Sequence, residues 1–182
     1  GFGELRSAYV RASIAKAERR HEEAIELYKR LVSMDRRFVA ELVPELMTCY
    51  CELGRMAQFD AYVEGLVRKD PSLRKELAYA AIVGDLAESR ALSSCIEDFI
   101  MNNAVLADLV NAEDLRAAAP EARDRTVKRV VKALRQLALS SARYRCTNCG
   151  YSTLRLIWHC PSCKLWETVR PIQTFQFQAL VS

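Results

Sequence analysis

The sequence predicts a mainly α-helical fold, in which a solenoid of helix pairs is followed by a small metal-binding β module. The prediction rests on recurring helical periodicity, a low content of glycine and proline, and two Cys-x-x-Cys pairs near the C-terminus. Six glycines and five prolines in 182 residues are too few for the turns of an all-β sandwich. A hydrophobic fraction of 51% excludes a disordered chain. No apolar run reaches the roughly 18–20 residues of a membrane span.

Apolar residues recur at helical spacing in three segments, and the segments themselves repeat. Tyr28, Val63 and Ile96 occupy corresponding positions and are 35 and 33 residues apart. This spacing is close to the 34-residue period of tetratricopeptide (TPR) repeats, which are pairs of antiparallel helices. Because one pair cannot bury its apolar face alone, we expect neighbouring pairs to stack into a TPR-like solenoid over residues 1–141.

The middle repeat has the clearest boundaries. Gly54 is expected to adopt a left-handed conformation and to end the first helix of a pair. Asp70 is expected to cap the next helix, with Pro71 in its first turn. Gly84 and Asp85 are interpreted likewise as the end of one helix and the start of another. The final repeat matches the pattern less well and is interpreted as a capping helix.

The solenoid sequence favours a scaffold or adaptor and not an enzyme. It lacks a glycine-rich phosphate loop, a nucleophile elbow and a paired acid/base motif. Cys49 and Cys51 are two apart in a predicted helix, so their side chains point about 200° away from each other and cannot share a metal. Together with Cys95 they are interpreted as small buried hydrophobic residues.

A basic helix is predicted from Pro120 to residue 139. Residues 116–145 carry nine basic and two acidic side chains, although the whole chain has a net charge of only +4. The basic positions of this helix are Arg125, Lys128, Arg129, Lys132 and Arg135. They form either the solvated face of a terminal solenoid helix or a binding stripe for the phosphates of nucleic acid or anionic lipid. No aromatic residue lies among these charges, which disfavours single-stranded nucleic acid.

The strongest chemical signal is C-T-N-C-G-(x9)-C-P-S-C. Cys146, Cys149, Cys160 and Cys163 form two Cys-x-x-Cys pairs with spacing suited to one tetrahedral metal ion. Two-residue spacing lets both sulfurs of a pair face the metal and lets loop N–H groups donate to them. Gly150 is expected to supply the positive φ that the first loop requires. The odd total of seven cysteines favours metal binding in a reducing compartment over a disulfide framework.

The sequence leaves the identity of the metal open. Tetrahedral four-sulfur sites take zinc or iron. The Cys-x-x-Cys-Gly and Cys-Pro-x-Cys loops are of the rubredoxin type, which favours iron. However, Lys164 replaces the glycine expected after the second loop, and the arm between the loops is shorter than in a rubredoxin. These departures favour a structural role over electron transfer. His159 is a weaker candidate ligand because four cysteines are already available.

The segment 142–182 is expected to form the metal-binding domain and to pack against the solenoid. About 41 residues are too few to sustain a hydrophobic core alone, so a metal is needed for folding. Residues 151–158 are expected to form a β-hairpin arm, with Leu154, Leu156 and Trp158 on one face. Together with Ile157 and Trp166, these side chains exceed what the segment can bury internally. The linker of residues 140–143 is too short for free movement.

The combination of solenoid and cysteine module resembles the lipopolysaccharide assembly protein B family of Gram-negative bacteria. In the solenoid the resemblance rests on Asp35-Arg36, Thr48-Cys49-Tyr50 and Leu53-Gly54. In the module it is carried by Tyr144, Arg145, Cys146, Cys149, Gly150, Trp158, His159, Cys160, Pro161, Ser162, Cys163, Trp166, Pro171 and Ile172. The resemblance covers the C-terminal portion of the family. It implies an N-terminal membrane anchor and first repeats that this sequence does not contain.

The resemblance implies a non-enzymatic regulator on the cytoplasmic side of the inner membrane. In that family the protein helps the FtsH protease to degrade the LpxC deacetylase and so restrains lipopolysaccharide synthesis. It also implies that one iron or zinc ion is held in a rubredoxin-like domain docked on the solenoid. Protein partners are expected and nucleic acid is not. Two alternatives remain: a nucleic-acid-binding zinc ribbon that uses the basic helix, and a rubredoxin-like electron carrier.

Overall fold

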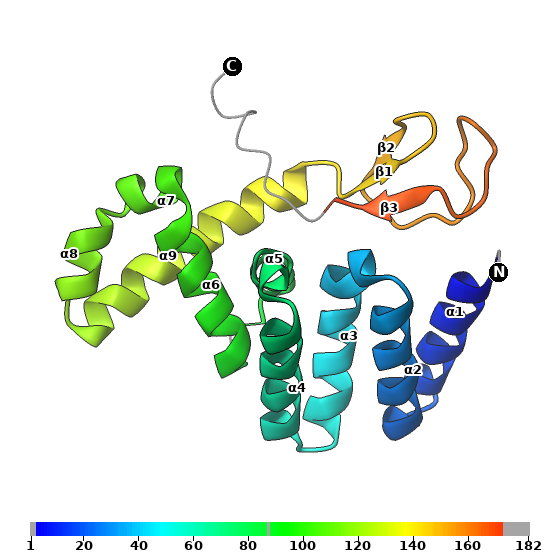
Figure 1. Cartoon of the computed structure of the whole chain (residues 1–182), viewed down its shortest axis with the longest axis horizontal. Coiled ribbons are helices and arrows are strands. Elements are labelled where there is room, and N and C mark those ends of the chain that lie inside the picture. The colour runs from blue at the N-terminus through cyan, green and yellow to red at the C-terminus, as the bar shows by residue number, and fades with distance from the viewer. Residues whose placement is uncertain (1–2, 87, 173–182) are drawn as a thin grey trace.

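The computed structural model describes residues 3–86 and 88–172 and confirms the predicted fold class. Within these residues a stack of α-helices is followed by a small three-stranded antiparallel sheet (Figure 1). The helices are α1 (Glu4–Ala17), α2 (His21–Met34), α3 (Val39–Glu52), α4 (Met56–Lys69), α5 (Arg74–Gly84), α6 (Arg90–Asn102), α7 (Ala104–Leu109), α8 (Ala112–Ala117) and α9 (Pro120–Ser140).

The first six helices form three consecutive pairs, α1–α2, α3–α4 and α5–α6. The first helices of the second and third pairs, α3 and α5, pack against each other, and so do the second helices, α4 and α6. This is the packing expected for stacked repeats. Tyr28, Val63 and Ile96 all lie buried in the second helix of their pair. The repeat deduced from their spacing is therefore confirmed at these positions.

A capped 3-10 turn links each pair to the next. Asp35 accepts a hydrogen bond from the Arg37 N–H (3.0 Å) at the start of η1 (Arg36–Phe38), and Asp70 accepts one from the Ser72 N–H (3.1 Å) at η2 (Pro71–Leu73). An ion pair between Arg36 and Asp70 joins the two turns. The predicted cap at Asp70 is confirmed, and Gly54 has the expected positive φ of 66°.

The start of α6 differs from the sequence prediction. Gly84 ends α5 as expected, and Asp85 takes a left-handed conformation with φ of 59°. However, α6 begins only at Arg90, because the side chain of Ser89 caps it by accepting the Leu92 N–H (3.2 Å). Asp85 therefore ends one helix and does not begin another.

Asp60 connects α4 to the start of α6. Its carboxylate is only 7% exposed and accepts hydrogen bonds from the Ser89 hydroxyl (2.5 Å) and the Ala91 N–H (3.3 Å). A carboxylate at a helix N-terminus satisfies N–H groups that lack a partner within the helix and is favoured by the helix dipole. The sequence analysis did not identify Asp60, because its partners lie about 30 residues further along the chain.

The last three helices depart from the pair pattern. The short helices α7 and α8 follow α6, and the 21-residue α9 then crosses beside α5 toward the sheet (Figure 1). Leu134 and Ala138 are the buried residues of α9. Among the described residues, no helix has an apolar stretch long enough to traverse a lipid bilayer.

The sheet consists of β1 (Tyr144–Cys146), β2 (Ser152–Thr153) and β3 (Val169–Pro171), in the order β2-β1-β3. Tyr144 pairs with Thr153 on one side and with Pro171 on the other. The predicted hairpin arm is thus correct only as far as Thr153. Leu154 is 56% exposed, whereas Leu156 and Trp158 pack against the helices, so the three do not act as one strand face.

We expect Asp60→Ala to lower the free energy of unfolding by about 1–3 kcal/mol, because the Ser89 hydroxyl and the Ala91 N–H lose a buried acceptor. Urea denaturation followed by circular dichroism would measure the change. Glu113→Ala, at an exposed acidic position of α8, is the control and should change stability by less than about 0.5 kcal/mol. Equal stability of both variants would show that Asp60 does not support α6.

Candidate metal centre

The four predicted ligands come together at one point in the module. The Sγ atoms of Cys146, Cys149, Cys160 and Cys163 all lie within 4.8 Å of one another. Two of these separations, Cys146–Cys163 and Cys149–Cys160, are 3.7 Å. Four sulfurs placed 2.3 Å from one tetrahedral ion would be about 3.8 Å apart. A disulfide would require about 2.05 Å, so these thiols are arranged for a metal and not for a bridge.

The two cysteine loops have matching backbone geometry. The Gly150 N–H donates to the Cys146 carbonyl (3.0 Å), and the Lys164 N–H donates to the Cys160 carbonyl (3.0 Å). The Cys146 and Cys160 N–H groups in turn donate to the carbonyls of Tyr151 (2.7 Å) and Leu165 (2.9 Å). Each loop is thereby closed from both ends, and each first cysteine is held in the same orientation.

Lys164 has a left-handed conformation with φ of 62°, close to the 78° of Gly150 at the matching position. The second loop therefore needs a positive φ at Lys164, just as the first loop does at Gly150. A lysine there carries some backbone strain, but the loop keeps its shape. The replacement of glycine at this position does not distort the metal site.

Hydrogen bonds favour the thiolate form of the first pair. The bond between Cys146 and Thr168 (3.2 Å between Sγ and Oγ1) and those from the backbone N–H groups of Cys149 and Asn148 lower the pKa of Cys146 to about 6. The pKa of Cys149 is lowered mainly by the Tyr151 N–H. Burial raises the pKa of Cys160 to about 11. A divalent cation would supply the charge that stabilises all four thiolates together.

His159 does not take part in the cluster. Its Nε2 atom lies 3.1 Å from the Lys164 carbonyl oxygen, and its ring packs against Trp166 with 4.7 Å between ring centroids. The donor set is therefore four sulfurs, which fits zinc or iron equally. His159 precedes the second loop and contacts Lys164 and Trp166, which follow it, so it joins the two ends of that loop.

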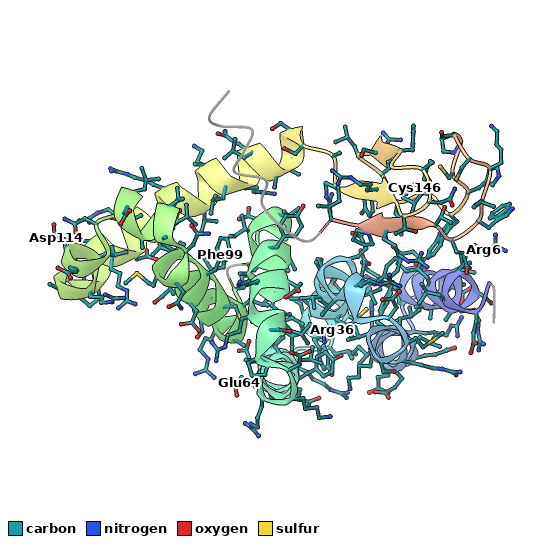
Figure 2. All side chains as sticks on the ribbon, turned by 45° about the horizontal axis from the view of Figure 1, so that its top comes forward. Arg6, Arg36, Glu64, Phe99, Asp114 and Cys146 are labelled. Atoms are coloured by element: carbon teal, nitrogen blue, oxygen red, sulfur yellow. The ribbon has the colours of Figure 1, made fainter. Side chains whose placement is uncertain are left out.

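Trp158 joins the module to the helices, as the docking prediction required. Its ring lies edge-on to Tyr9 of α1, with 5.7 Å between centroids, and is stacked on Phe38 of η1 at 6.0 Å. Leu156 also packs against the helical core. Trp166 is 55% exposed, although Arg6 of α1 lies over its ring at 4.8 Å; Figure 2 shows Arg6 beside the module. The predicted docking is thus made by Leu156 and Trp158, whereas Ile157 packs within the module and Leu154 and Trp166 stay largely exposed.

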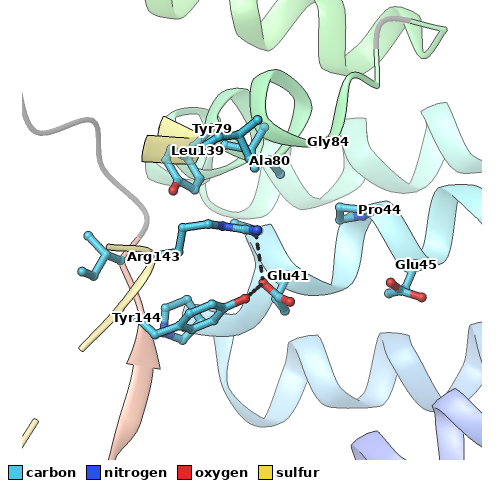
Figure 3. A pocket seen from close by; sticks show the side chains of 13 residues that line it. Glu41, Pro44, Glu45, Tyr79, Ala80, Gly84, Leu139, Arg143 and Tyr144 are labelled. Carbon is cyan, nitrogen blue, oxygen red and sulfur yellow. Dashed lines mark hydrogen bonds and ion pairs between the residues drawn. The ribbon is translucent and has the colours of Figure 1, made fainter. Parts of the chain in front are cut away.

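Polar contacts fix the other side of the module. The Tyr144 hydroxyl donates to Glu41 Oε2 on α3 at 2.6 Å, and Arg143 Nη2 lies 3.7 Å from the same oxygen (Figure 3). Burial, followed by the charge of Glu41, raises the pKa of Tyr144 above its usual value, so the phenol remains a hydrogen-bond donor. These residues line a cavity of about 210 Å³ that is also bounded by Tyr79 of α5.

A second ion pair lies beside Trp158. Arg170 Nε of β3 is 3.8 Å from Asp35 Oδ2, and its guanidinium lies over the Phe38 ring at 5.5 Å. Burial raises the pKa of Asp35, but hydrogen bonds from Arg37 outweigh this effect and hold it below its usual value. Asp35 therefore caps η1 and also contacts the module, which links the repeat boundary to the docking site.

The remaining cysteines take no part in the site. Cys49 and Cys95 are buried in the helical core, as predicted, and burial raises the pKa of both thiols. Cys51 is exposed, so its assignment as a buried residue is wrong. It lies two residues from Cys49 on the opposite side of α3.

Comparison with known proteins agrees with the resemblance drawn from the sequence. Residues 144–171 match a family model described as the rubredoxin metal binding domain. Over 167 residues the chain is 30% identical to lipopolysaccharide assembly protein B of Escherichia coli strain K12, covering 90% of this chain and 42% of that protein. The protein of the same name from Haemophilus influenzae is 25% identical over 179 residues, covering 92% and 43%. The chain thus spans about two fifths of the length of these relatives.

We expect the double variant Cys146→Ser/Cys149→Ser to lose its metal, because two sulfur ligands cannot hold a tetrahedral site closed. Native mass spectrometry should find one zinc or iron ion in the unchanged chain and none in the variant. Cys51→Ser is the matched control and should retain the ion. An unchanged chain without metal after expression with both metals supplied would contradict the assignment of these ligands.

We expect Trp158→Ala to destabilise the chain by about 2–3 kcal/mol, since a half-buried indole leaves its site between Tyr9 and Phe38. Trp166→Ala removes the same side chain from an exposed site and should cost less than about 1 kcal/mol. Thermal unfolding of the metal-loaded variants would measure both. A larger effect at Trp166 would show that the docking contact lies elsewhere.

Proposed function

We propose that this chain is part of a non-enzymatic adaptor in lipopolysaccharide assembly, which helps the FtsH protease to degrade the LpxC deacetylase. The observation that carries the proposal is the similarity to proteins named lipopolysaccharide assembly protein B over 90% of the chain. Because the similarity extends over both helices and cysteine module, it supports a shared arrangement of the two. The proposed site of action is the cytoplasmic side of the inner membrane, reached through an anchor outside this sequence.

We further propose that residues 1–141 form the helical domain and residues 142–182 the metal-binding domain, with Cys146, Cys149, Cys160 and Cys163 as ligands. The separations between sulfurs and the matching loops support this assignment. The described boundary between α9 and β1 consists of residues 141–143. The metal would supply structural stability by closing the two loops. The residues around it would then hold Trp158 and Tyr144 against the helices.

An adaptor is favoured because the module covers the solenoid instead of extending from it. Contacts from Tyr144, Trp158 and Arg170 reach α1, η1 and α3, so the module and the helices present one continuous surface. A surface made from two parts that hold each other in place is suited to bringing two proteins together. A partner that contacts both parts would bind only the metal-loaded chain.

Electron transfer is the second candidate, and one observation removes an argument against it. Lys164 keeps the left-handed conformation of the second loop, so its presence does not argue against a rubredoxin-like iron site. This function would require iron and a reversible one-electron couple. The adaptor function predicts instead that zinc and iron forms bind partners equally.

The proposal is tested by mixing the metal-loaded chain with purified FtsH and LpxC and following both binding and the lifetime of LpxC. We expect the chain to bind at least one of the two proteins and to shorten the lifetime of LpxC. Cys146→Ser/Cys149→Ser should abolish both effects, and Cys51→Ser should preserve them. Zinc and iron forms should act alike.

Two results would overturn the proposal. If neither FtsH nor LpxC binds the metal-loaded chain and LpxC decays at an unchanged rate, the proposed partners are wrong. If only the iron form acts and its effect follows its redox state, the electron-transfer candidate replaces the adaptor.

A further inference from the structure

The outward face of α9 carries a straight stripe that is separate from the metal module. Arg125, Arg129, Lys132, Gln136 and Leu139 follow one another at intervals of four, three, four and three residues, and all five are exposed. At 100° per residue they lie within about 40° of the direction opposite the buried Leu134. At 1.5 Å per residue the stripe is about 21 Å long. Its first three residues are cationic, and Leu139 at its end also borders the cavity beside Tyr79 (Figure 3).

The three cations of the stripe differ from the other basic residues of α9. Arg123 pairs with Glu97 of α6 (2.6 Å), Arg135 with Asp85 (2.7 Å) and Lys128 with Asp124 (2.6 Å). Within residues 3–86 and 88–172, by contrast, Arg125, Arg129 and Lys132 form no ion pair. The pairs made by Arg123 and Arg135 hold α9 against its neighbours, which leaves the stripe directed at solvent.

We propose that this stripe binds the surface of a bilayer containing anionic phospholipid. A solvated helix face ordinarily mixes charges of both signs, whereas no acidic residue lies between the three cations of this stripe. The acidic residue of α9 at the same angle, Glu121, precedes them in the first turn, where the helix dipole favours a carboxylate. A helix lying flat on a bilayer places such cations against lipid phosphates, and each contributes about a fivefold increase in binding.

A duplex nucleic acid fits this geometry less well. A helix that reads DNA must enter the major groove, which requires its flanks to be free. The flanks of α9 are instead held by α5, α8 and the ion pairs to Glu97 and Asp85. A flat anionic surface needs only the outward stripe.

The test is co-sedimentation of the metal-loaded chain with vesicles at low ionic strength. Vesicles of equal parts phosphatidylglycerol and phosphatidylcholine are compared with vesicles of phosphatidylcholine alone. The triple variant R125Q/R129Q/K132Q should bind the anionic vesicles about a hundredfold more weakly than the unchanged chain. The charge-matched control R68Q/K69Q/K75Q removes three exposed cations from α4 and α5 and should change binding by less than about threefold.

We expect the unchanged chain to bind anionic but not neutral vesicles, with circular dichroism showing that both triple variants stay folded. Equal binding by the two triple variants would overturn the proposal, because it would reveal a general effect of charge. Failure of the unchanged chain to bind anionic vesicles would also overturn it. Stripe-dependent binding to a 20-base-pair DNA duplex without vesicle binding would assign the stripe to nucleic acid. These outcomes are independent of FtsH and LpxC, so the two proposals fail separately.

Discussion

The metal module depends on contact with the helices, because it has almost no core of its own. Its buried cluster consists of Tyr144, Cys146, Cys160 and Val169, and two of these four are candidate metal ligands. The largest apolar side chain directed inward, Trp158, packs outside this cluster, between Tyr9 and Phe38 of the helical part. The module therefore has two expected sources of stability: a metal ion on its four sulfurs and the aromatic contact that joins it to the solenoid.

The features that could be predicted from the sequence are those that depend on local spacing. Two Cys-x-x-Cys pairs specify a loop geometry by themselves, and the structure brings the four sulfurs together as expected. The 33–35-residue recurrence likewise placed Tyr28, Val63 and Ile96 on buried helix faces, since each helix follows its own periodicity. The small size of the module indicated that it must pack against the helices. The size did not indicate which helical residues it contacts, which are Tyr9 and Phe38 for Trp158.

The features that the sequence did not reveal depend on contacts between distant residues. Ser89 caps α6 at Arg90, and serine is a common helix cap, but its hydrogen bond to Asp60, 29 residues earlier, could not be inferred from the sequence. Glu41 accepts a hydrogen bond from the hydroxyl of Tyr144, which lies 103 positions further along the chain. Lys164 shows another limit of the sequence. A glycine signals a positive φ, but loop hydrogen bonds impose this conformation at Lys164 as well, so the residue type alone did not reveal that the two loops have the same shape.

The magnitudes indicate which of the two sources of stability controls the module. Burying a large apolar side chain contributes roughly 1.5–3 kcal/mol, so Trp158 and Leu156 together supply a few kcal/mol. A structural zinc supplies on the order of 10 kcal/mol. Docking alone therefore stabilises the module by less than a bound metal would, whereas a metal without docking would leave Trp158 in water. Loss of the metal would release Tyr144 from Glu41 and Arg170 from Asp35 and uncover α1, η1 and α3. Under the proposed function, a metal held by the four cysteines would thus decide which face of the solenoid is open to a partner without taking part in any chemistry.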